Sequence, residues 1–484
     1  MTLKELFPGL PDTEVKGITQ NSKEVGPGYV FFAVKGATVD GHDFIDAAIR
    51  QGAAAVVSAR DLSAPVPTIK VDDIDAAMAD TACKFYNNPA DKMNVTGITG
   101  TKGKTSIAYL LESILLAAKR KPTVFGTINY RVNGEVLSKA ANTTPPALAL
   151  QKMIARTAAK NSADLVMEVS SHALQLKRAE GINFNTAVFT NLQRDHLDFH
   201  ATFENYFAAK KKLFENLLAP QNKKQNRAAI INIDDPYGQK LIDFLKNKVK
   251  IITYGLIKPA DFNATDIRAG LDGVSFKVNG KPAHINLLGE HNVYNALAAI
   301  AAAGQSGIPT DIALQGLNNL KGVPGRMERV DMGQDFYVFV DFAYTNEAMQ
   351  RAFDAISPFK SGKITMVFGC GGQRDSSKRP LMGATAAKNS DLVLITKDNP
   401  RGEDANNIFI DILKGMTGCD NFKIIPDRRE AIFEAIKNAR RGDIIIIAGK
   451  GHEDYQILPT GTIHFSDRET AEEALKTYVR PQKI

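Results

Sequence analysis

The sequence predicts an α/β protein of three domains, built from parallel sheets with helices between the strands. At 484 residues the chain is long enough for about three domains. Short apolar runs alternate with helical stretches through its second and third parts, which is the order of parallel strands joined by helical crossovers. Several of these runs end in a loop rich in Gly, Asp or Ser, and parallel sheets bind ligands at such strand ends.

The first predicted domain, residues 1–88, is a small α/β domain. Its expected strands are Tyr29–Val34, Ala54–Ser58 and Thr68–Val71, with a helix near Phe44–Gln51. The central domain, residues 89–329, has expected strands at Leu165–Val169, Ala187–Thr190, Ala229–Ile233 and Ile251–Tyr254. The C-terminal domain, residues 330–484, is expected to be Rossmann-like, with strands at Ile364–Phe368, Leu392–Thr396 and Ile444–Ile447 and a helix at Asp427–Ala439.

Residues 95–106, VTGITGTKGKTS, join a short strand through a glycine-rich loop to the start of a helix. In such loops backbone N–H groups surround phosphate oxygens, and the helix N-terminus adds partial positive charge. Lys104 would reach the outer phosphates, and the Thr105 hydroxyl would hold Mg²⁺. The spacing differs from the common P-loop, since Ile98 stands where a glycine is expected. A glycine turn beside a surface lysine is the alternative, but the strand–loop–helix order favours cleavage of ATP or GTP.

Two ionisable side chains follow neighbouring predicted strands. Glu168 lies at the end of Leu165–Val169, and His196 follows Ala187–Thr190 within the run TNLQRDH. Taken singly, each is more easily explained as a capping or core polar residue. Beside a phosphate-binding loop, however, a carboxylate and an imidazole can both ligate magnesium, and we expect this role.

Lys210 lies within the apolar stripe of a predicted helix, Phe203–Leu217. The stripe is formed by Tyr206, Leu213, Phe214 and Leu217 at helical spacing. Lys211 and Lys212 point away from it and are expected to be solvated. Burial would depress the pKa of Lys210 and leave a neutral amine. Such an amine near metal ions can react with CO₂ to form a carbamate, which is a metal-ligating anion.

Composition sets the remaining expectations. A formal net charge of +7, spread along the chain, gives no nucleic-acid footprint and only a weak preference for anionic substrates. The three cysteines are far apart and show no metal-site spacing, which is typical of a reducing cytoplasm. Neither a leader nor a membrane-length apolar run is apparent. We therefore expect a cytoplasmic protein without membrane insertion.

A set of short runs in a fixed order resembles the Mur ligases of peptidoglycan synthesis, in particular the type that adds the third amino acid. The runs are GITGTKGKTS, ANTTP (141–145), EVSSH (168–172), TNLQRDHLDFH (190–200), YFAAKKKLF (206–214), GEHNVYNALAA (289–299), GRME (325–328), FGCGGQRDSSKRPLMG (368–383), DNPRGED (398–404) and AGKGHEDYQI (448–457). They span nearly the whole chain. The resemblance implies an N-terminal domain that binds UDP-MurNAc, a central ATP-binding domain and a C-terminal amino-acid-binding domain.

The resemblance also implies roles for individual residues. The ATP and phosphate contacts are Gly100, Thr101, Gly103, Lys104, Thr105, Asn292, Asn295, Arg326 and Asp341. The UDP-MurNAc-dipeptide contacts are Ser22, Asn142, Thr143, Thr144, Ser170 and Arg178. Those for the incoming amino acid are Arg374, Asp398, Asn399, Arg401, Gly449 and Glu453. The catalytic set is Lys104, Glu168, His196 and Lys210, and the magnesium ligands are Thr105, Glu168, His196 and the carbamate of Lys210, which is the family's carbamylated lysine.

The implied reaction is acyl-phosphate amide ligation. ATP, with Mg²⁺, phosphorylates the D-glutamate γ-carboxylate of UDP-MurNAc-L-Ala-D-Glu, and an amine then displaces the phosphate. Arg401 would bind the second carboxylate of meso-diaminopimelate and Glu453 its ammonium group, whereas lysine would leave Arg401 unpaired. We therefore expect diaminopimelate, with L-lysine or L-ornithine as alternatives. A hinged C-terminal domain and a monomer are also expected.

Three positions depart from the family pattern. Lys102 replaces an asparagine in the glycine loop, Tyr344 replaces the histidine of DYAHTP, and Gln373 replaces an aspartate beside Arg374. Two other functions compete with this interpretation. A sister ligase, such as a folylpolyglutamate synthase or another Mur enzyme, shares the ATP-binding core but not DNPR, GKGHE or NSKEV. A P-loop ATPase module would need no acceptor pocket.

Overall fold

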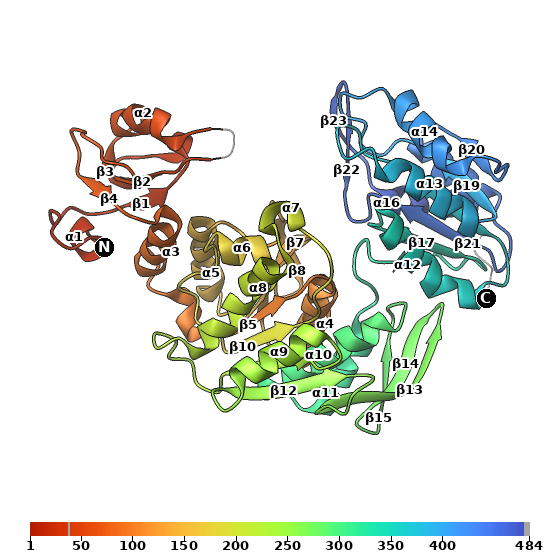
Figure 1. Cartoon of the computed structure of the whole chain (residues 1–484), viewed down its shortest axis with the longest axis horizontal. Helices are drawn as coiled ribbons and strands as arrows, with labels where there is room; N and C mark the ends of the chain where they lie inside the picture. The colour runs from red at the N-terminus through yellow and green to blue at the C-terminus, as the bar shows by residue number, and fades with distance from the viewer. Residues whose placement is uncertain (37–38, 479–484) are drawn as a thin grey trace. The chain divides into compact units, whose positions relative to one another are not determined.

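The computed structural model describes residues 1–36 and 39–478 (Figure 1). The contacts within the chain divide these residues into two compact units. The first unit comprises Met1–Asn263 and Tyr294–Leu317, and the second comprises Ala264–Val293 and the described chain from Asn318 onward. The first unit contains strands of two separate sheets, one at the N-terminus and one in the centre. The mixed α/β architecture predicted from the sequence is therefore present.

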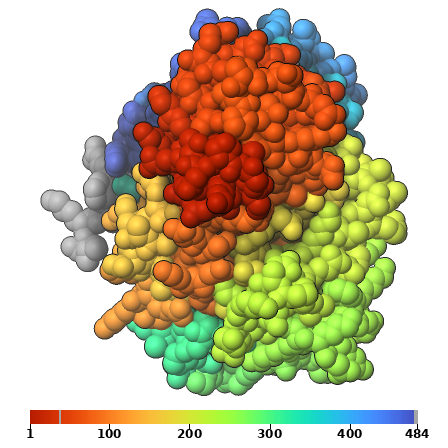
Figure 2. All heavy atoms as spheres, turned by 90° about the vertical axis from the view of Figure 1, so that its left-hand side faces the viewer, coloured from red at the N-terminus to blue at the C-terminus, as the bar shows by residue number. Residues whose placement is uncertain are grey.

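The N-terminal sheet has four parallel strands in chain order. They are β1 (Gly17–Thr19), β2 (Tyr29–Ala33), β3 (Ala53–Ser58) and β4 (Thr68–Lys70), accompanied by the helices α1 (Leu3–Leu6), α2 (Ile45–Arg50) and α3 (Ile74–Phe85). This segment is red to orange in Figures 1 and 2, with the start of the chain at its surface. Leu148 of the central part joins its hydrophobic core, and α3 packs against α5 (Ala147–Ala158).

The central sheet of the first unit has the strand order β12-β11-β10-β5-β9-β6-β7-β8. Its strands are β5 (Asn94–Thr99), β6 (Pro122–Phe125), β7 (Asn129–Val132), β8 (Glu135–Lys139), β9 (Asp164–Glu168), β10 (Thr186–Phe189), β11 (Ala228–Asn232) and β12 (Lys250–Gly255). Those from β12 to β6 are parallel, and the four expected strands of this region are confirmed within a few residues.

Antiparallel strands extend the predicted parallel sheet at its edges. Strands β7 and β8 form antiparallel pairs beside β6. Their connection contains Asn133 and Gly134, whose φ angles of 54° and 84° are those of a two-residue hairpin turn. A second Asn-Gly turn, at Asn279 and Gly280, joins β14 (Gly273–Val278) to β15 (Lys281–Ile285). Strand β14 pairs antiparallel with β15 on one side and with β13 (Phe262–Gly270) on the other.

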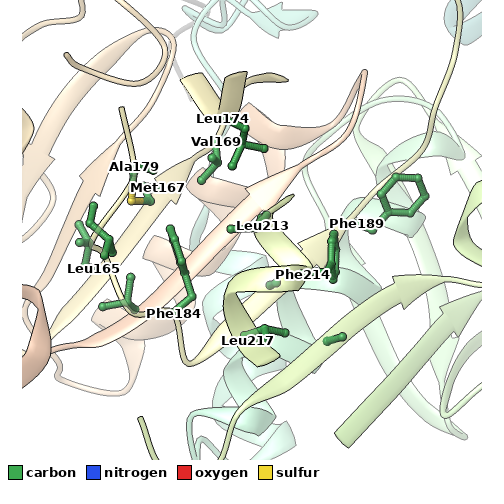
Figure 3. Packing of buried hydrophobic residues seen from close by; sticks show 14 of the residues in the cluster. Leu165, Met167, Val169, Leu174, Ala179, Phe184, Phe189, Leu213, Phe214 and Leu217 are labelled. Atoms are coloured by element: carbon green, nitrogen blue, oxygen red, sulfur yellow. The ribbon is translucent and has the colours of Figure 1, made fainter. Parts of the chain in front are cut away.

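The helices that accompany the central sheet are α4 (Lys104–Ala117), α5, α6 (Ser171–Gln175), α7 (Leu197–His200), α8 (Phe203–Leu218), α9 (Pro236–Leu245), α10 (His291–Gln305) and α11 (Thr310–Asn319). Of these, α5, α6, α8 and α9 contribute side chains to one large apolar cluster. Figure 3 shows part of this cluster, with Phe214 and Leu217 of α8 among side chains from β9 and β10. Burial of such side chains stabilises each by about 1.5–3 kcal/mol, so the cluster fixes α8 against the sheet.

The second unit has a six-stranded sheet of order β16-β17-β21-β18-β19-β20, parallel except for β16. The strands are β16 (Glu328–Arg329), β17 (Tyr337–Asp341), β18 (Ile364–Phe368), β19 (Leu392–Ile395), β20 (Phe422–Ile424) and β21 (Ile444–Ala448). The helices are α12 (Asn346–Ile356), α13 (Lys378–Asn389), α14 (Ala405–Leu413), α15 (Arg428–Lys437) and α16 (Asp467–Tyr478), and a hairpin is formed by β22 (Tyr455–Leu458) and β23 (Gly461–His464).

The carboxyl ends of three adjacent central strands define where a site can form. In the order β10-β5-β9, Thr99 pairs with Phe189 on one side, and Ile98 pairs with Glu168 on the other. The loops that follow these strands therefore emerge at one edge. In the part of the chain that the structure describes, no helix has both the length and the apolar character to span a bilayer.

Candidate active site

The glycine loop, residues 100–103, connects β5 to α4 in a conformation that requires glycine at two positions. Gly100 and Gly103 have φ angles of 143° and 91°, which L side chains rarely adopt. A Cβ at Gly100 would collide with the Thr190 hydroxyl, and one at Gly103 would collide with Asn295. The loop thus brings its backbone close to β10 and α10, and α4 begins at Lys104 with its N-terminal N–H groups facing this loop.

Two lysines converge on one carbonyl of this loop. The Nζ atoms of Lys104 and Lys210 both donate to the Gly100 carbonyl, each at 2.9 Å. Lys210 is only 2% exposed on α8, as its place in the apolar stripe predicted. Burial, and then the charge of Lys104, lower the pKa of Lys210 well below its usual value. Two ammonium groups on one carbonyl would repel each other, which favours the neutral form of Lys210.

Glu168, at the end of β9, is 1% exposed, and hydroxyl and amide donors hold both of its carboxylate oxygens. Thr105 donates to Oε2 at 3.0 Å, and Thr127 donates to Oε2 at 2.9 Å through its hydroxyl and to Oε1 at 2.8 Å through its N–H. Thr105 and Glu168 therefore offer two oxygen donors side by side. Magnesium in phosphate-binding sites needs only one or two such protein ligands beside phosphate and water, so these residues fit it.

His196 is less closely associated with this pair. It directly precedes α7, with a left-handed φ of 53°, and its ring lies near other rings, with centroids 4.9 Å from His172 and 6.2 Å from Tyr206. Burial lowers the pKa of His196, so a ring nitrogen is free of protons near neutral pH. Among the described residues no three His, Cys, Asp or Glu side chains form a ready metal cluster.

The predicted substrate loop, ANTTP, lies next to Glu168. Thr144 is buried and donates to the Glu168 carbonyl at 2.8 Å, while its hydroxyl accepts the Ser170 N–H at 3.2 Å. Arg178 donates to the Thr144 carbonyl at 3.1 Å and to Asn142 Oδ1 at 3.4 Å. The other residues of this set have simpler positions: Thr143 is half-buried at a hydroxyl distance of 3.1 Å from Thr127, and Ser22 begins a short turn between β1 and β2.

The residues predicted to contact adenosine and phosphate belong to both units. Asn295 approaches Gly103 in the first unit, whereas Asn292, on the same helix, donates to the Leu288 carbonyl at 2.7 Å in the second. Asp341, at the end of β17, accepts the Met327 N–H at 2.6 Å, and burial raises the pKa of Asp341 to about 6. Arg326, which partly offsets this rise, lies 5.6 Å from the Phe342 ring centre.

The residues predicted to bind the incoming amino acid lie in the second unit, around Asn399. The side-chain amide of Asn399 donates to Glu453 Oε2 at 3.0 Å. The main-chain carbonyl of Asn399 accepts from Arg401 Nη1 at 3.3 Å. Arg401 also donates to the Gly372 carbonyl at 2.9 Å and has a left-handed φ of 55°. A guanidinium and a carboxylate are thus fixed on either side of one asparagine.

The remaining predicted members of this cluster differ in exposure. Asp398 is buried, and burial raises its pKa against the opposing charges of Arg428 and Lys450. Gly449 has a φ of 112°, and a Cβ there would lie 2.7 Å from Asp398 Oδ2, so this close approach requires glycine. Arg374 is exposed.

Sequence reasoning missed two residues that hold Glu453. Lys450 is completely buried, and its Nζ lies 3.3 Å from Glu453 Oε2 and 3.4 Å from Asn399 Oδ1. Tyr455 donates its hydroxyl to Glu453 Oε1 at 3.1 Å. Both belong to the run AGKGHEDYQI, but nothing in the run distinguishes a buried lysine from an exposed one.

The three departures from the family pattern have defined surroundings. Lys102 forms an ion pair with Asp195 at 3.2 Å, which joins the glycine loop to the loop of His196. Tyr344 is 49% exposed, and Lys378 Nζ lies 4.8 Å from its ring centre. Gln373 has a left-handed φ of 54°, and its N–H donates to Glu403 at 2.8 Å.

Comparison with known families gives three matches along the chain. Residues 14–86 match the model of the Mur ligase family catalytic domain, residues 98–303 match the Mur ligase middle domain, and residues 325–451 match the Mur ligase glutamate ligase domain. The first two segments lie inside the predicted domains 1–88 and 89–329, whereas the third begins at residue 325, before the predicted start of the C-terminal domain at 330. The boundaries at 88 and 329 stay predictions.

Curated proteins similar over the whole length include a UDP-N-acetylmuramoyl-L-alanyl-D-glutamate–2,6-diaminopimelate ligase of Solibacter usitatus, 43% identical over 98% of this chain and 96% of the relative. A protein of the same name from Syntrophomonas wolfei is 42% identical over 98% of both chains. A solved structure with that name covers 99% of each chain with a TM-score of 0.73 and 30% identity. The ADP complex of MurF from Thermotoga maritima, 21% identical with a TM-score of 0.64, shares the fold.

Proposed function

The chain belongs to the Mur ligase family, and on that premise we propose that it is the ATP-dependent, ADP-forming ligase that adds meso-diaminopimelate in peptidoglycan synthesis. The acceptor is the D-glutamate γ-carboxylate of UDP-MurNAc-L-Ala-D-Glu. The observation that supports this most is the Asn399 cluster, in which Arg401 and Glu453 both contact one asparagine. A cation and an anion held so close match the second amino–carboxylate group of diaminopimelate.

The nucleotide end of the reaction belongs to the glycine loop and its neighbours. Lys104 and the N-terminus of α4 would offset phosphate charge as the γ-phosphoryl group moves to the acceptor carboxylate. Thr105, Glu168 and His196 would hold Mg²⁺, which supplies further charge neutralisation when bound. Asn292, Asn295, Arg326 and Asp341 would serve the adenosine and phosphate side, together with Gly100, Thr101 and Gly103.

Lys210 is the proposed site of a carbamate. Its buried, neutral amine would add to the carbon of CO₂ and release one proton, which converts a basic side chain into an anion. That anion would face Lys104, whose positive charge favours it. The change would also relieve the crowding of two amines on the Gly100 carbonyl.

The acceptor would bind along the loop that follows β8 and β9. Ser22 in the N-terminal sheet would contact the uridine nucleotide, and Asn142, Thr143, Thr144, Ser170 and Arg178 would contact the MurNAc-dipeptide. The hydrogen bonds that join Arg178 to this loop support a preformed acceptor site. A cytoplasmic monomer without a nucleic-acid or membrane partner completes the proposal.

Selection against lysine and ornithine would follow from the charge of Arg401, which these amino acids would leave without a carboxylate partner. Arg374, Asp398 and Gly449 complete the proposed pocket with Asn399, Arg401 and Glu453. Lysine has no second carboxylate, so Arg401 would be desolvated without a partner at a cost of about 1–3 kcal/mol.

A requirement for both UDP-MurNAc-L-Ala-D-Glu and the amino acid tests the ligase reaction. ADP release should need UDP-MurNAc-L-Ala-D-Glu and diaminopimelate together, and mass spectrometry should show the amide product. Each single omission serves as its own control. Rapid ADP release with neither acceptor would instead favour an ATPase module.

A further inference from the structure

We propose that Thr127 is a positioning residue that orients Glu168 for the metal and links this carboxylate to the dipeptide loop through Thr143. The inference rests on the proposed function, because it concerns the metal and acceptor sites named above. No motif pointed to Thr127, which follows β6 in the run FGTINY. Thr127 is part of the proposed site only because the fold places it against Glu168.

Gly126 and Thr127 together form a cradle for the Glu168 carboxylate. The Thr127 N–H donates to Oε1 at 2.8 Å, and its hydroxyl donates to Oε2 at 2.9 Å. A Cβ at Gly126 would lie 2.5 Å from Oε1, so glycine is needed for this approach. One residue therefore holds both oxygens, which fixes the plane of the carboxylate.

The protons in this cluster can run in only one direction. The Thr127 hydroxyl has a single proton, and it donates this proton to Glu168 Oε2. The contact of 3.1 Å between the Thr127 and Thr143 hydroxyls must then be donated by Thr143. The resulting chain runs from Thr143 through Thr127 to Glu168 Oε2, where Thr105 also donates.

This series of hydrogen bonds connects two proposed ligand sites, the metal site and the acceptor site. Residues behind a metal ligand fix its orientation, and their loss weakens metal binding by about 10–100-fold. Thr143 lies in the acceptor loop. A dipeptide contact at the Thr143 hydroxyl would therefore change the hydrogen bond that Thr143 donates to Thr127, and with it the orientation of Glu168. Linkage requires the effect to be reciprocal, so metal–nucleotide binding also changes acceptor affinity.

The test uses Mn²⁺ with ADP as the probe, followed by electron paramagnetic resonance titration of the full chain. Thr127→Val keeps the backbone N–H and the shape but removes the hydroxyl. We expect it to weaken Mn²⁺ binding by about 10–100-fold and to abolish the affinity change caused by UDP-MurNAc-L-Ala-D-Glu. Thr127→Ser restores the hydroxyl and should restore both effects.

Thr186→Val is the matched control, because Thr186 is a buried threonine of β10 whose hydroxyl has no partner among the described residues. It should bind Mn²⁺ like the wild type. Unchanged Mn²⁺ affinity in Thr127→Val would overturn this inference alone, whereas a wild type that does not bind Mn²⁺ with ADP would overturn the proposed function. If Thr127→Val does not fold, Thr143→Val tests the chain one donor earlier, and unchanged coupling in that variant overturns the proposal.

Discussion

Arg401 is the residue on which the choice of amino acid depends in this account. Its Nη1 is held by the carbonyls of Gly372 and Asn399, which directs the guanidinium without neutralising it. A hydrogen bond to a charged group contributes about 1.5–3 kcal/mol, which is about 10–100-fold in affinity. The side chain is therefore both oriented and available for a carboxylate.

Arg401→Ala should lower kcat/KM for diaminopimelate by about 10–100-fold and change the low rate with lysine much less. The expected result is a loss of preference measured from initial rates with both amino acids. Arg429→Ala removes an arginine from the surface of α15 and should leave the preference intact. A full preference for diaminopimelate in Arg401→Ala would show that Arg401 has another role.

Asp341 predicts a pH dependence of stability. Burial raises the pKa of Asp341 to about 6, above the ordinary value of an aspartate. In the window between these values the folded state binds more protons than the unfolded state, so the free energy of unfolding falls as pH rises. A shift of about two pKa units corresponds to about 3 kcal/mol.

Asp341→Asn removes this contribution while keeping an oxygen for the Met327 N–H. Its Tm relative to the wild type should therefore rise between about pH 4.5 and about pH 7.5, the window in which the aspartate loses its proton. Thermal unfolding without nucleotide measures this difference. A difference in Tm that is the same at both pH values would contradict the raised pKa.

Some site residues could be predicted from sequence and others could not, for a simple reason. The burial of Lys210 follows from four apolar neighbours on the same helix, which is local information. Thr127 meets Thr143 and Glu168 across sequence separations of 16 and 41 residues, which only the fold brings together. Lys450 is similar, since its contact with Asn399 spans 51 residues.

At the scale of elements, the junction of α8 with the glycine loop sets the chemistry of Lys210. Helix α8 buries one face against the central sheet, and that face carries Lys210 to the Gly100 carbonyl. A carbamate there should be visible by ¹³C NMR after exchange with ¹³C-labelled bicarbonate. The signal should be lost on acidification, because the amine is then protonated and CO₂ released.

Lys210→Arg should abolish this signal, and Lys211→Arg is the matched control one position along the same helix. Lys211 lies outside the buried face and pairs with Glu215, so its replacement should leave the signal unchanged. A carbamate signal that persists in Lys210→Arg would place the modification elsewhere.

The elements that sequence reasoning found are those with strong apolar runs. The strands β5, β9, β10, β11, β18, β19 and β21 were expected, but β6 and β17, which are also largely buried, were not. The hairpins β7–β8 and β14–β15 were missed although each carries an Asn-Gly turn, which is a strong local signal. Their strands are partly or wholly exposed, so no apolar run marked them.

At the scale of the whole molecule, the proposed chemistry is divided between the two units. The glycine loop, Glu168, Lys210 and the acceptor loop belong to the first unit, and the Asn399 cluster belongs to the second. Each half can therefore be tested with its own ligand. The family models match segments in both, so the ligase assignment does not depend on either half alone.

The identity of the added amino acid is the most direct test of the proposed ligase and of the role of Arg401. The measurement offers diaminopimelate, lysine and ornithine in parallel, each with ATP, Mg²⁺ and UDP-MurNAc-L-Ala-D-Glu, and compares rates of ADP formation with the mass of the product. The account predicts fast, acceptor-dependent turnover and an amide product with diaminopimelate, and far slower rates with the other two. A preference for lysine or ornithine would contradict the role given to Arg401, and no amide product with any of the three would contradict the proposed ligase.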